Sequence, residues 1–248
     1  GLDEEANFEN RWHLTVSNDA ENIEKDSKFE SEKLKNIVKK CNKVLHKVRK
    51  LRTPPSLDKK QLTSWNALVI KGLAVSGRVL DRKDYIQSAR ESLEFIEKNQ
   101  FDKNILMACY INKMSKFPAY LDDHAFLLDA ILEFLQSEWD TKLLHFAIKL
   151  ADTLIDNFMD EVKGGFFFTR NNHEKLIFRS KPMSDDAMPS GNGIACFTLQ
   201  RLGFLVGDEK YLHASKKTLE SGFNLLKESP HGHLNLLNAL EEYLDPPE

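Results

Sequence analysis

The sequence has few cysteines, little net charge and no long hydrophobic run. Its three cysteines, Cys41, Cys109 and Cys196, are far apart and lack a Cys-x-x-Cys spacing. A disulfide framework is therefore not expected, and a reducing, cytoplasmic location is favoured. The formal net charge of -3 argues against nucleic acid as a partner. Acidic residues interrupt the longest apolar run, 125–135, so no membrane span or membrane partner is expected.

Several motifs of known chemistry are also missing. The sequence contains no Gly-x-Gly-x-x-Gly motif, phosphate-binding loop or Gly-x-Ser-x-Gly elbow, which argues against nucleotide-dependent enzymes and serine hydrolases. No second cluster of His or Cys supplements the Asp-Asp-His group at 122–124, so neither a metal nor another cofactor is expected. Residues 1–28 are acidic and weakly periodic, which predicts an extended lead-in.

What the sequence does contain is a short polar cluster that opens an apolar helical run three times. The clusters are Thr63-Ser64-Trp65-Asn66, Leu121-Asp122-Asp123-His124 and Pro189-Ser190-Gly191-Asn192. The numbers of Ser64, Asp122 and Ser190 differ by 58 and 68. A second helical run follows each cluster and repeats with the same two spacings, at Tyr85, Leu143 and Tyr211. Two markers with shared spacings predict an internal repeat of three helical hairpins.

In each predicted hairpin the first helix is apolar on nearly all sides, as in 125–132, and the second is amphipathic, as in 85–98. The first type must be buried, whereas the second has one face in water. Each hairpin is therefore an inner helix followed by an outer one. Further helices are predicted at 29–51 and 233–243, which makes eight helices in an all-α domain over 29–248.

Two extended segments are predicted between these helices. Residues 104–111 resemble a short ribbon. The run Gly164–Thr169, a turn at Asn171-Asn172 and residues 176–179 together predict a small β-hairpin.

The polar clusters hold more polar groups than helix capping needs. Thr63, Asp122 and Ser190 are good N-cap residue types, and capping explains part of the pattern. In a ring of hairpins the inner helices all start at one cavity, where their dipoles favour anionic or hydroxyl-rich ligands. The side chains expected to contact such a ligand are Asp58, Trp65, Asn66, Tyr120, Arg179, Asp185, Ser190 and Asn192.

The most reactive group in the sequence is Asp122, Asp123 and His124, because a carboxylate beside an imidazole can exchange protons near neutral pH. The alternative is an N-cap aspartate followed by a histidine that is hydrogen-bonded in the core. Asp185 and Asp186 are a second acid pair at the same cavity, with Asp186 as a further catalytic candidate, or else solvated loop residues. Arg179 and Lys181 would bind an anionic group or pair with those acids.

These motifs together resemble those of the YyaL-like, or spermatogenesis-associated protein 20, family. The resemblance spans most of the chain, and its matching stretches are 4–9, 58–59, 62–68, 119–127, 164–169, Arg179 with Lys181-Pro182, 186–187 and 189–192. The sequence departs from the family pattern at His124, where a tyrosine is usual, and at Met188, where an acidic residue is common.

This resemblance implies an (α/α) toroid of the six-hairpin glycosidase type, similar to N-acylglucosamine 2-epimerases and normally preceded by a thioredoxin-like domain. The toroid is expected to be incomplete in this chain. Its implied function is to act on or bind a sugar, with acid–base chemistry of the epimerase, isomerase or glycosidase kind. The alternative is a non-catalytic module that binds a ligand or partner for the thioredoxin-like domain. Association with the missing toroid and thioredoxin-like parts, or a homodimer, is expected.

Overall fold

The computed structural model describes residues 5–13 and 31–246 and divides the chain into two compact units, 1–58 and 59–248. The first unit contains helix α2 (Ser31–Arg49), which confirms the helix predicted at 29–51. Most of the predicted lead-in lies outside the described residues. The units divide at 58/59, whereas the predicted boundary at 28/29 falls among residues that the structure does not describe and stays a prediction. Helix α2 therefore belongs with the first unit and not with the helical hairpins.

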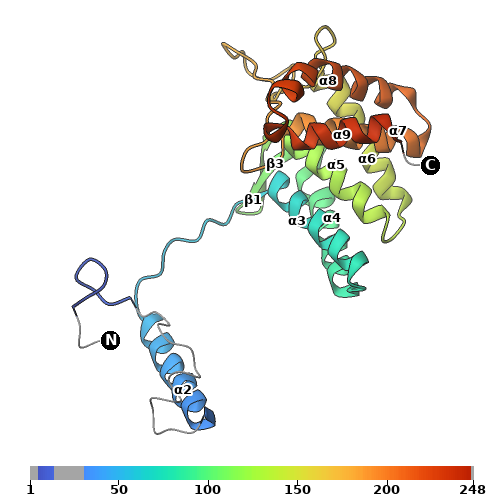
Figure 1. Ribbon diagram of the computed structural model, residues 1–248. Helices are drawn as coiled ribbons and strands as arrows, with labels where there is room; N and C mark the ends of the chain where they lie inside the picture. The colour runs from blue at the N-terminus through green and yellow to red at the C-terminus, as the bar shows by residue number, and fades with distance from the viewer. Residues whose placement is uncertain (1–4, 14–30, 247–248) are drawn as a thin grey trace. The chain divides into compact units, whose positions relative to one another are not determined.

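The second unit is built from three helical hairpins and a final helix (Figure 1). Together with α2, they make the eight α-helices that occur among the described residues, as predicted. The elements are α3 (Thr63–Val79), α4 (Lys83–Gln100), α5 (Leu121–Leu135), α6 (Thr141–Phe158), α7 (Gly191–Val206), α8 (Glu209–Glu228), the 3-10 turn η1 (Pro230–Gly232) and α9 (Leu234–Leu244).

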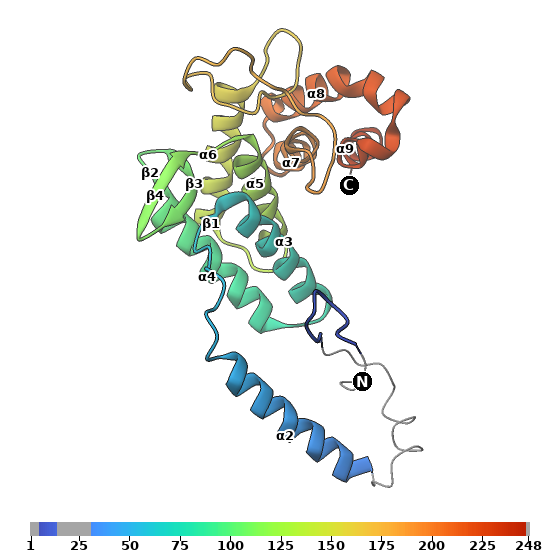
Figure 2. The ribbon, with the colours of Figure 1, turned by 90° about the vertical axis from the view of Figure 1, so that its left-hand side faces the viewer.

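The helices form an inner and an outer layer. Inner helix α5 packs between α3 and α7, and α7 packs against α9, while α4, α6 and α8 each cover the inner helix of their own hairpin. Figure 2 shows the two layers from the side. Every residue of α5 except Asp122 is buried, as its all-round apolar sequence predicts. The core therefore runs along the inner layer.

A small antiparallel sheet lies beside the first hairpin. Its central strand β3 (Ile105–Ile111) pairs with β1 (Gln61–Leu62), β2 (Phe101–Asp102) and β4 (Met114–Pro118). This confirms the ribbon predicted at 104–111. Because β1 leads directly into α3, the sheet fixes where the first polar cluster begins.

The β-hairpin predicted at 164–179 is wrong, because this segment is an irregular loop with a single bridge between Met159 and Phe166. The backbone N–H of Phe166 donates to the side chain of Asn192, and that of Phe168 donates to the carbonyl of Ser180. These backbone groups are therefore satisfied outside any ladder. We call residues 159–190 the long loop; Figure 2 shows it in yellow to orange between α6 and α7.

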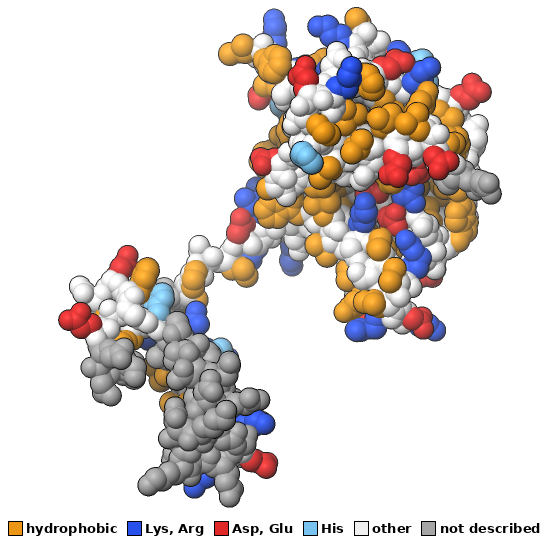
Figure 3. All heavy atoms as spheres, in the orientation of Figure 1, with side chains coloured by type: hydrophobic (Ala, Val, Ile, Leu, Met, Phe, Trp, Pro, Cys, Tyr) orange, Lys and Arg blue, Asp and Glu red, His pale blue; other side chains and the backbone are white. Residues whose placement is uncertain are grey.

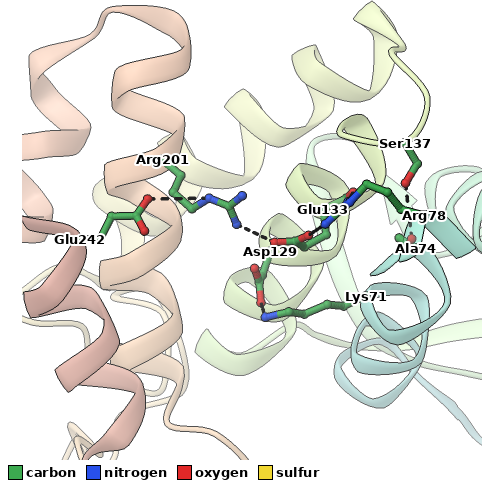
Figure 4. Close-up of polar contacts among 8 residues, drawn as sticks. All are labelled: Lys71, Ala74, Arg78, Asp129, Glu133, Ser137, Arg201 and Glu242. Atoms are coloured by element: carbon green, nitrogen blue, oxygen red, sulfur yellow. Dashed lines mark hydrogen bonds and ion pairs between the residues drawn. The ribbon is translucent and has the colours of Figure 1, made fainter. Parts of the chain in front are cut away.

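A network of ion pairs crosses the inner layer (Figure 4). Lys71 pairs with Asp129 at 2.7 Å, and Arg201 pairs with Glu133 at 2.7 Å. The first two residues are 58 apart and the last two are 68 apart, so each pair joins equivalent positions of neighbouring repeats. Further pairs connect Glu133 with Arg78 and Arg201 with Glu242. The repeat therefore organises the charges as well as the apolar core.

Glu133→Gln is expected to lower the free energy of unfolding by about 2–4 kcal/mol, because two arginines would then face a neutral amide in a largely buried site. Urea denaturation measures the change. Glu138→Gln is the matched control, since Glu138 is exposed and pairs with Arg90 at 3.0 Å. Its expected cost is below about 1 kcal/mol. Equal losses in the two variants would contradict a structural role for the network.

The two terminal inner helices expose apolar side chains. On the face in Figure 3, hydrophobic side chains gather over α9, where Leu234, Leu237 and Leu244 are exposed. Helix α3 exposes Trp65 and Val69 in the same way. Exposed apolar faces of this kind are typical of surfaces that pack against another element. The predicted association through an open edge, by a second copy or by further hairpins, stays a prediction.

Candidate active site

The three polar clusters meet at one end of the inner layer. Asp123 Oδ1 accepts the backbone N–H of Ser64 at 2.9 Å, which ties the start of α5 to the start of α3. At the start of α7, a β-carbon added to Gly191 would collide with Oδ1 of Asp122. The carboxylate of Asp122 therefore lies directly against the backbone of α7. Residues from three repeats thus surround the acid pair.

Asp122 differs from Asp123 and His124 in its surroundings. Among the described residues its carboxylate has no hydrogen-bond partner, and it is the one residue of α5 that is not buried. Burial, together with the neighbouring charge of Asp123, raises the pKa of Asp122 to about 6. A half-buried carboxyl group with a pKa near neutrality can both accept and donate a proton.

Asp123 combines a structural role with an unusual pKa. Its second oxygen accepts the backbone N–H of Tyr120 at 2.9 Å, so Asp123, at the third position of the helix, satisfies the N-cap residue Tyr120, and Asp122 does not. Burial raises the pKa of Asp123 to about 6, although the hydrogen bonds from Tyr120 and Ser64 oppose that shift. Two adjacent carboxyl groups with raised pKa values therefore sit at the start of one buried helix.

His124 is enclosed in the core. Its side chain is 1% exposed, and the ring centroid lies 5.0 Å from that of Phe158. Nδ1 is 2.9 Å from the carbonyl oxygen of Tyr120, so Nδ1 carries the proton. Burial lowers the pKa of His124 to about 4, which keeps the ring neutral. This geometry favours the alternative left open by the sequence, a histidine hydrogen-bonded in the core.

In the third cluster, the side chains of Ser190 and Asn192 form hydrogen bonds within the protein. Asn192 is completely buried, and its amide bonds to both backbone groups of Phe166 and to the carbonyl of Pro182. Ser190 accepts the N–H of Gly193 as the N-cap of α7 and is also buried. The polar atoms of Ser190 and Asn192 thus fix the long loop and the helix start, and the role of these two residues in holding a ligand stays a prediction.

The two members of the second predicted acid pair have different surroundings. Asp185 accepts the backbone N–H groups of Ser190 and Asn235, at 2.7 and 2.9 Å, and so ties the start of α7 to α9. Asp186 is exposed on the long loop. This exposure favours the solvated-loop interpretation of Asp186, and its catalytic role stays a prediction.

The remaining predicted residues are placed differently. Trp65 is 59% exposed beside Ser64, whereas Asn66 donates to the carbonyl of Leu62 within its own helix start. Tyr120 stacks on Phe168 with 5.0 Å between ring centroids. Asp58 is exposed and belongs to the first unit. Trp65 and Tyr120 thus remain available beside the acid pair.

The two predicted cations separate in the structure. Lys181 pairs with Asp160 at 2.7 Å and not with Asp185 or Asp186. Arg179 has no ion pair among the described residues; it donates to the carbonyl of Thr169 and lies 4.1 Å from the ring centroid of Phe167. Sequence reasoning missed Arg170 and His173 on the same loop, because nothing local indicates that the loop folds toward Tyr120.

Two classes of site are absent from the described part of the chain. Within 5–13 and 31–246, no three His, Cys, Asp or Glu side chains gather closely enough to hold a metal ion. None of the helices seen there has the length and apolarity needed to cross a bilayer.

Comparison with known proteins relates the chain to one group of sequences. No family model matches it. It is 30% identical to human spermatogenesis-associated protein 20 over 179 residues, or 68% of this chain, and 29% identical to the rat protein. Over these residues the chain is a homologue of spermatogenesis-associated protein 20. It spans only 23% of the length of those relatives. An uncharacterized protein from Caenorhabditis elegans is 26% identical over 79% of the chain.

Solved structures share the fold. This homologue of spermatogenesis-associated protein 20 superposes on a GH76 α-mannanase from Bacteroides thetaiotaomicron (TM-score 0.62, 15% identity, 79% of this chain and 56% of that one). A cellobiose 2-epimerase from Bacillus thermoamylovorans gives a TM-score of 0.56 at 15% identity. That superposition covers 67% of this chain and 45% of the epimerase. A third structure is an inactive α-1,6-mannanase variant from Salegentibacter, in which two successive aspartates are changed to asparagine. Its TM-score is 0.51 at 15% identity, and the superposition covers 64% of this chain and 46% of the mannanase. The fold is therefore an α/α toroid, as predicted.

Proposed function

We propose that this chain forms part of a carbohydrate-active toroid in which Asp122 transfers a proton at a sugar carbon or a glycosidic oxygen. The observation that carries the proposal is the unpartnered, half-buried carboxyl group of Asp122, whose pKa is raised to about 6. Groups poised near neutral pH in this way are typical of general acids and bases. The sugar-acting proteins that share the fold support this substrate class.

Asp123 is proposed as the second carboxyl group of the pair. The mannanase variant with two successive Asp→Asn changes is inactive, so at least one of two adjacent aspartates is needed for activity in that protein. Asp122 and Asp123 resemble that pair in residue type and in being adjacent in sequence. Exposed Trp65 would provide an aromatic face for a sugar ring.

A non-catalytic ligand-binding or partner-binding module is the second candidate. The observation that favours it is the structural use of His124, Ser190, Asp185 and Asn192, whose polar groups are hydrogen-bonded within the described part of the chain. An enzyme needs a second group across the reacting bond or carbon. In this alternative the site binds a sugar and releases it unchanged.

Proton NMR in D2O tests the proposal on the chain as it stands. The substrates are mannose, cellobiose and α-1,6-mannobiose, which report exchange at C2, epimer formation and glycosidic cleavage respectively. We expect at least one of these reactions above the buffer rate. Saturation-transfer contacts to a sugar without any reaction would instead support the binding module, and the absence of both would contradict a function directed at these three neutral sugars.

A further inference from the structure

Two arginines of the long loop lack the carboxylate partners that comparable cations have. The half-buried Lys and Arg side chains that form ion pairs are Lys71, Arg90, Lys181, Arg201 and Lys217. Arg170 and Arg179 are the two half-buried cations in the described part of the chain that form none. Withdrawing a guanidinium from water without an opposite charge is unfavourable. An anion from outside the chain would remove that cost.

Unpartnered polar atoms gather on the same stretch. Of the seven buried side-chain nitrogen and oxygen atoms that lack a hydrogen bond in the described structure, four belong to residues 169–179. They are Thr169 Oγ1, Arg170 Nε, His173 Nδ1 and Arg179 Nε. Thr169 is only 7% exposed. Buried polar atoms are normally paired, so this concentration indicates that a ligand or solvent satisfies them.

Contacts within the loop bring these residues together. Arg179 Nη2 donates to the carbonyl of Thr169 at 2.6 Å, while its guanidinium carbon lies 4.1 Å from the ring centroid of Phe167. The backbone N–H of His173 donates to the carbonyl of Arg170 at 3.2 Å. The two arginines therefore lie on one folded segment. Its rigid, planar guanidinium groups suit carboxylate or phosphate oxygens.

The segment is attached to the start of α5, where the acid pair lies. Phe168 accepts the backbone N–H of Leu121 at 3.0 Å and stacks on Tyr120. The ring of His173 lies 6.1 Å from that of Tyr120. The pKa of His124, lowered mainly by burial, is lowered further by the charge of Arg170. The unpaired positive charge is therefore close to α5, yet neither arginine forms an ion pair with Asp122 or Asp123.

We propose that Thr169, Arg170, His173 and Arg179 bind the anionic group, a carboxylate or a phosphate, of a saccharide whose ring lies at Asp122. The inference rests on the proposed function for the sugar and adds the charge of the substrate. It assigns a binding role to three residues, Thr169, Arg170 and His173, that sequence reasoning did not select. A neutral sugar would leave both guanidinium groups unpaired.

Titration calorimetry with mannose, mannuronate and mannose 6-phosphate tests this proposal, with inorganic phosphate as a fourth probe. We expect the wild-type chain to bind at least one anionic sugar about 10-fold or more tightly than mannose. Arg170→Gln and Arg179→Gln should each weaken that binding by about 10- to 100-fold. Lys175→Gln, which removes an exposed charge from the same loop, should change it less than about 2-fold.

The outcomes separate the two proposals. Equal affinity for the three sugars would overturn the anionic substrate class and leave the sugar function standing. Phosphate binding that depends on both arginines, with no binding of any sugar, would keep the anion site and overturn the sugar function. Whichever of mannuronate and mannose 6-phosphate binds more tightly shows whether the site prefers a carboxylate or a phosphate. Circular dichroism and thermal unfolding verify that each variant is folded. Arg179→Lys retains the positive charge and should therefore keep part of the selectivity for the anionic sugar over mannose.

Discussion

Asp122→Asn is expected to raise the melting temperature near pH 7.5 while it lowers any sugar turnover by about 10²- to 10⁴-fold. At that pH the carboxyl group, with a pKa of about 6, is ionised in a site where burial and the charge of Asp123 oppose the charge. The amide has nearly the same shape and carries no charge. The expected gain is about 1–3 kcal/mol, with the larger value as an upper bound because Asp122 is partly exposed.

The gain should depend on pH in a defined way. The folded-state pKa of Asp122, about 6, lies above its ordinary value of 3.8. The protonated carboxyl therefore contributes stability that is fully present below about pH 4 and is lost as the pH rises through 6. Asparagine does not titrate. The difference between variant and wild type should be near zero at pH 4 and largest above pH 7.

Asp156→Asn is the matched control, because Asp156 is exposed on α6. Its effect should stay within about 0.5 kcal/mol at every pH. The pKa of His124 is lowered to about 4, so its contribution to stability changes with pH in the opposite direction to that of Asp122. His124 is present in all three proteins, and its contribution therefore cancels in the comparison. A stability difference that is constant with pH, or full turnover in Asp122→Asn, would remove Asp122 from the proposed acid–base role.

The helices could be predicted because their signals are local. The apolar residues of α5 exclude water on all sides, and the repeat spacing separates inner from outer helices without any knowledge of contacts. The roles of adjacent polar residues are different. Asp122 and Asp123 are neighbours in sequence, yet one lies against Gly191 of α7 and the other accepts the N–H of Ser64. Only the packing of distant helix starts decides which carboxyl group is left unpartnered.

The long loop shows why the site was only partly predictable. The run Phe166–Thr169 followed by Asn171-Asn172 has the composition of a β-hairpin. Asn192, 26 residues from Phe166, takes both of its backbone groups instead. The loop then folds toward Tyr120 and carries Arg170 and His173 with it. A non-local side-chain contact of this kind leaves no signal in the local pattern.

Asn192→Ala should be among the most destabilising single changes in the second unit, with an expected loss of about 3–5 kcal/mol. The amide of Asn192 accepts the N–H of Phe166 at 2.6 Å and donates to the carbonyls of Phe166 and Pro182 at 2.9 and 2.7 Å. Alanine would leave all three backbone groups without these partners in a buried position. Urea denaturation followed by circular dichroism measures the loss.

Asn66→Ala provides the comparison, because Asn66 occupies the equivalent repeat position and its amide makes a single hydrogen bond within the described structure, of 2.7 Å to the carbonyl of Leu62. Its expected cost is about 1 kcal/mol. Amide hydrogen exchange should locate the damage: the amides of 166–168 should exchange faster in Asn192→Ala, while those of α3 should not. Equal costs for the two variants, or unchanged protection at 166–168, would mean that the long loop is held in place by other contacts.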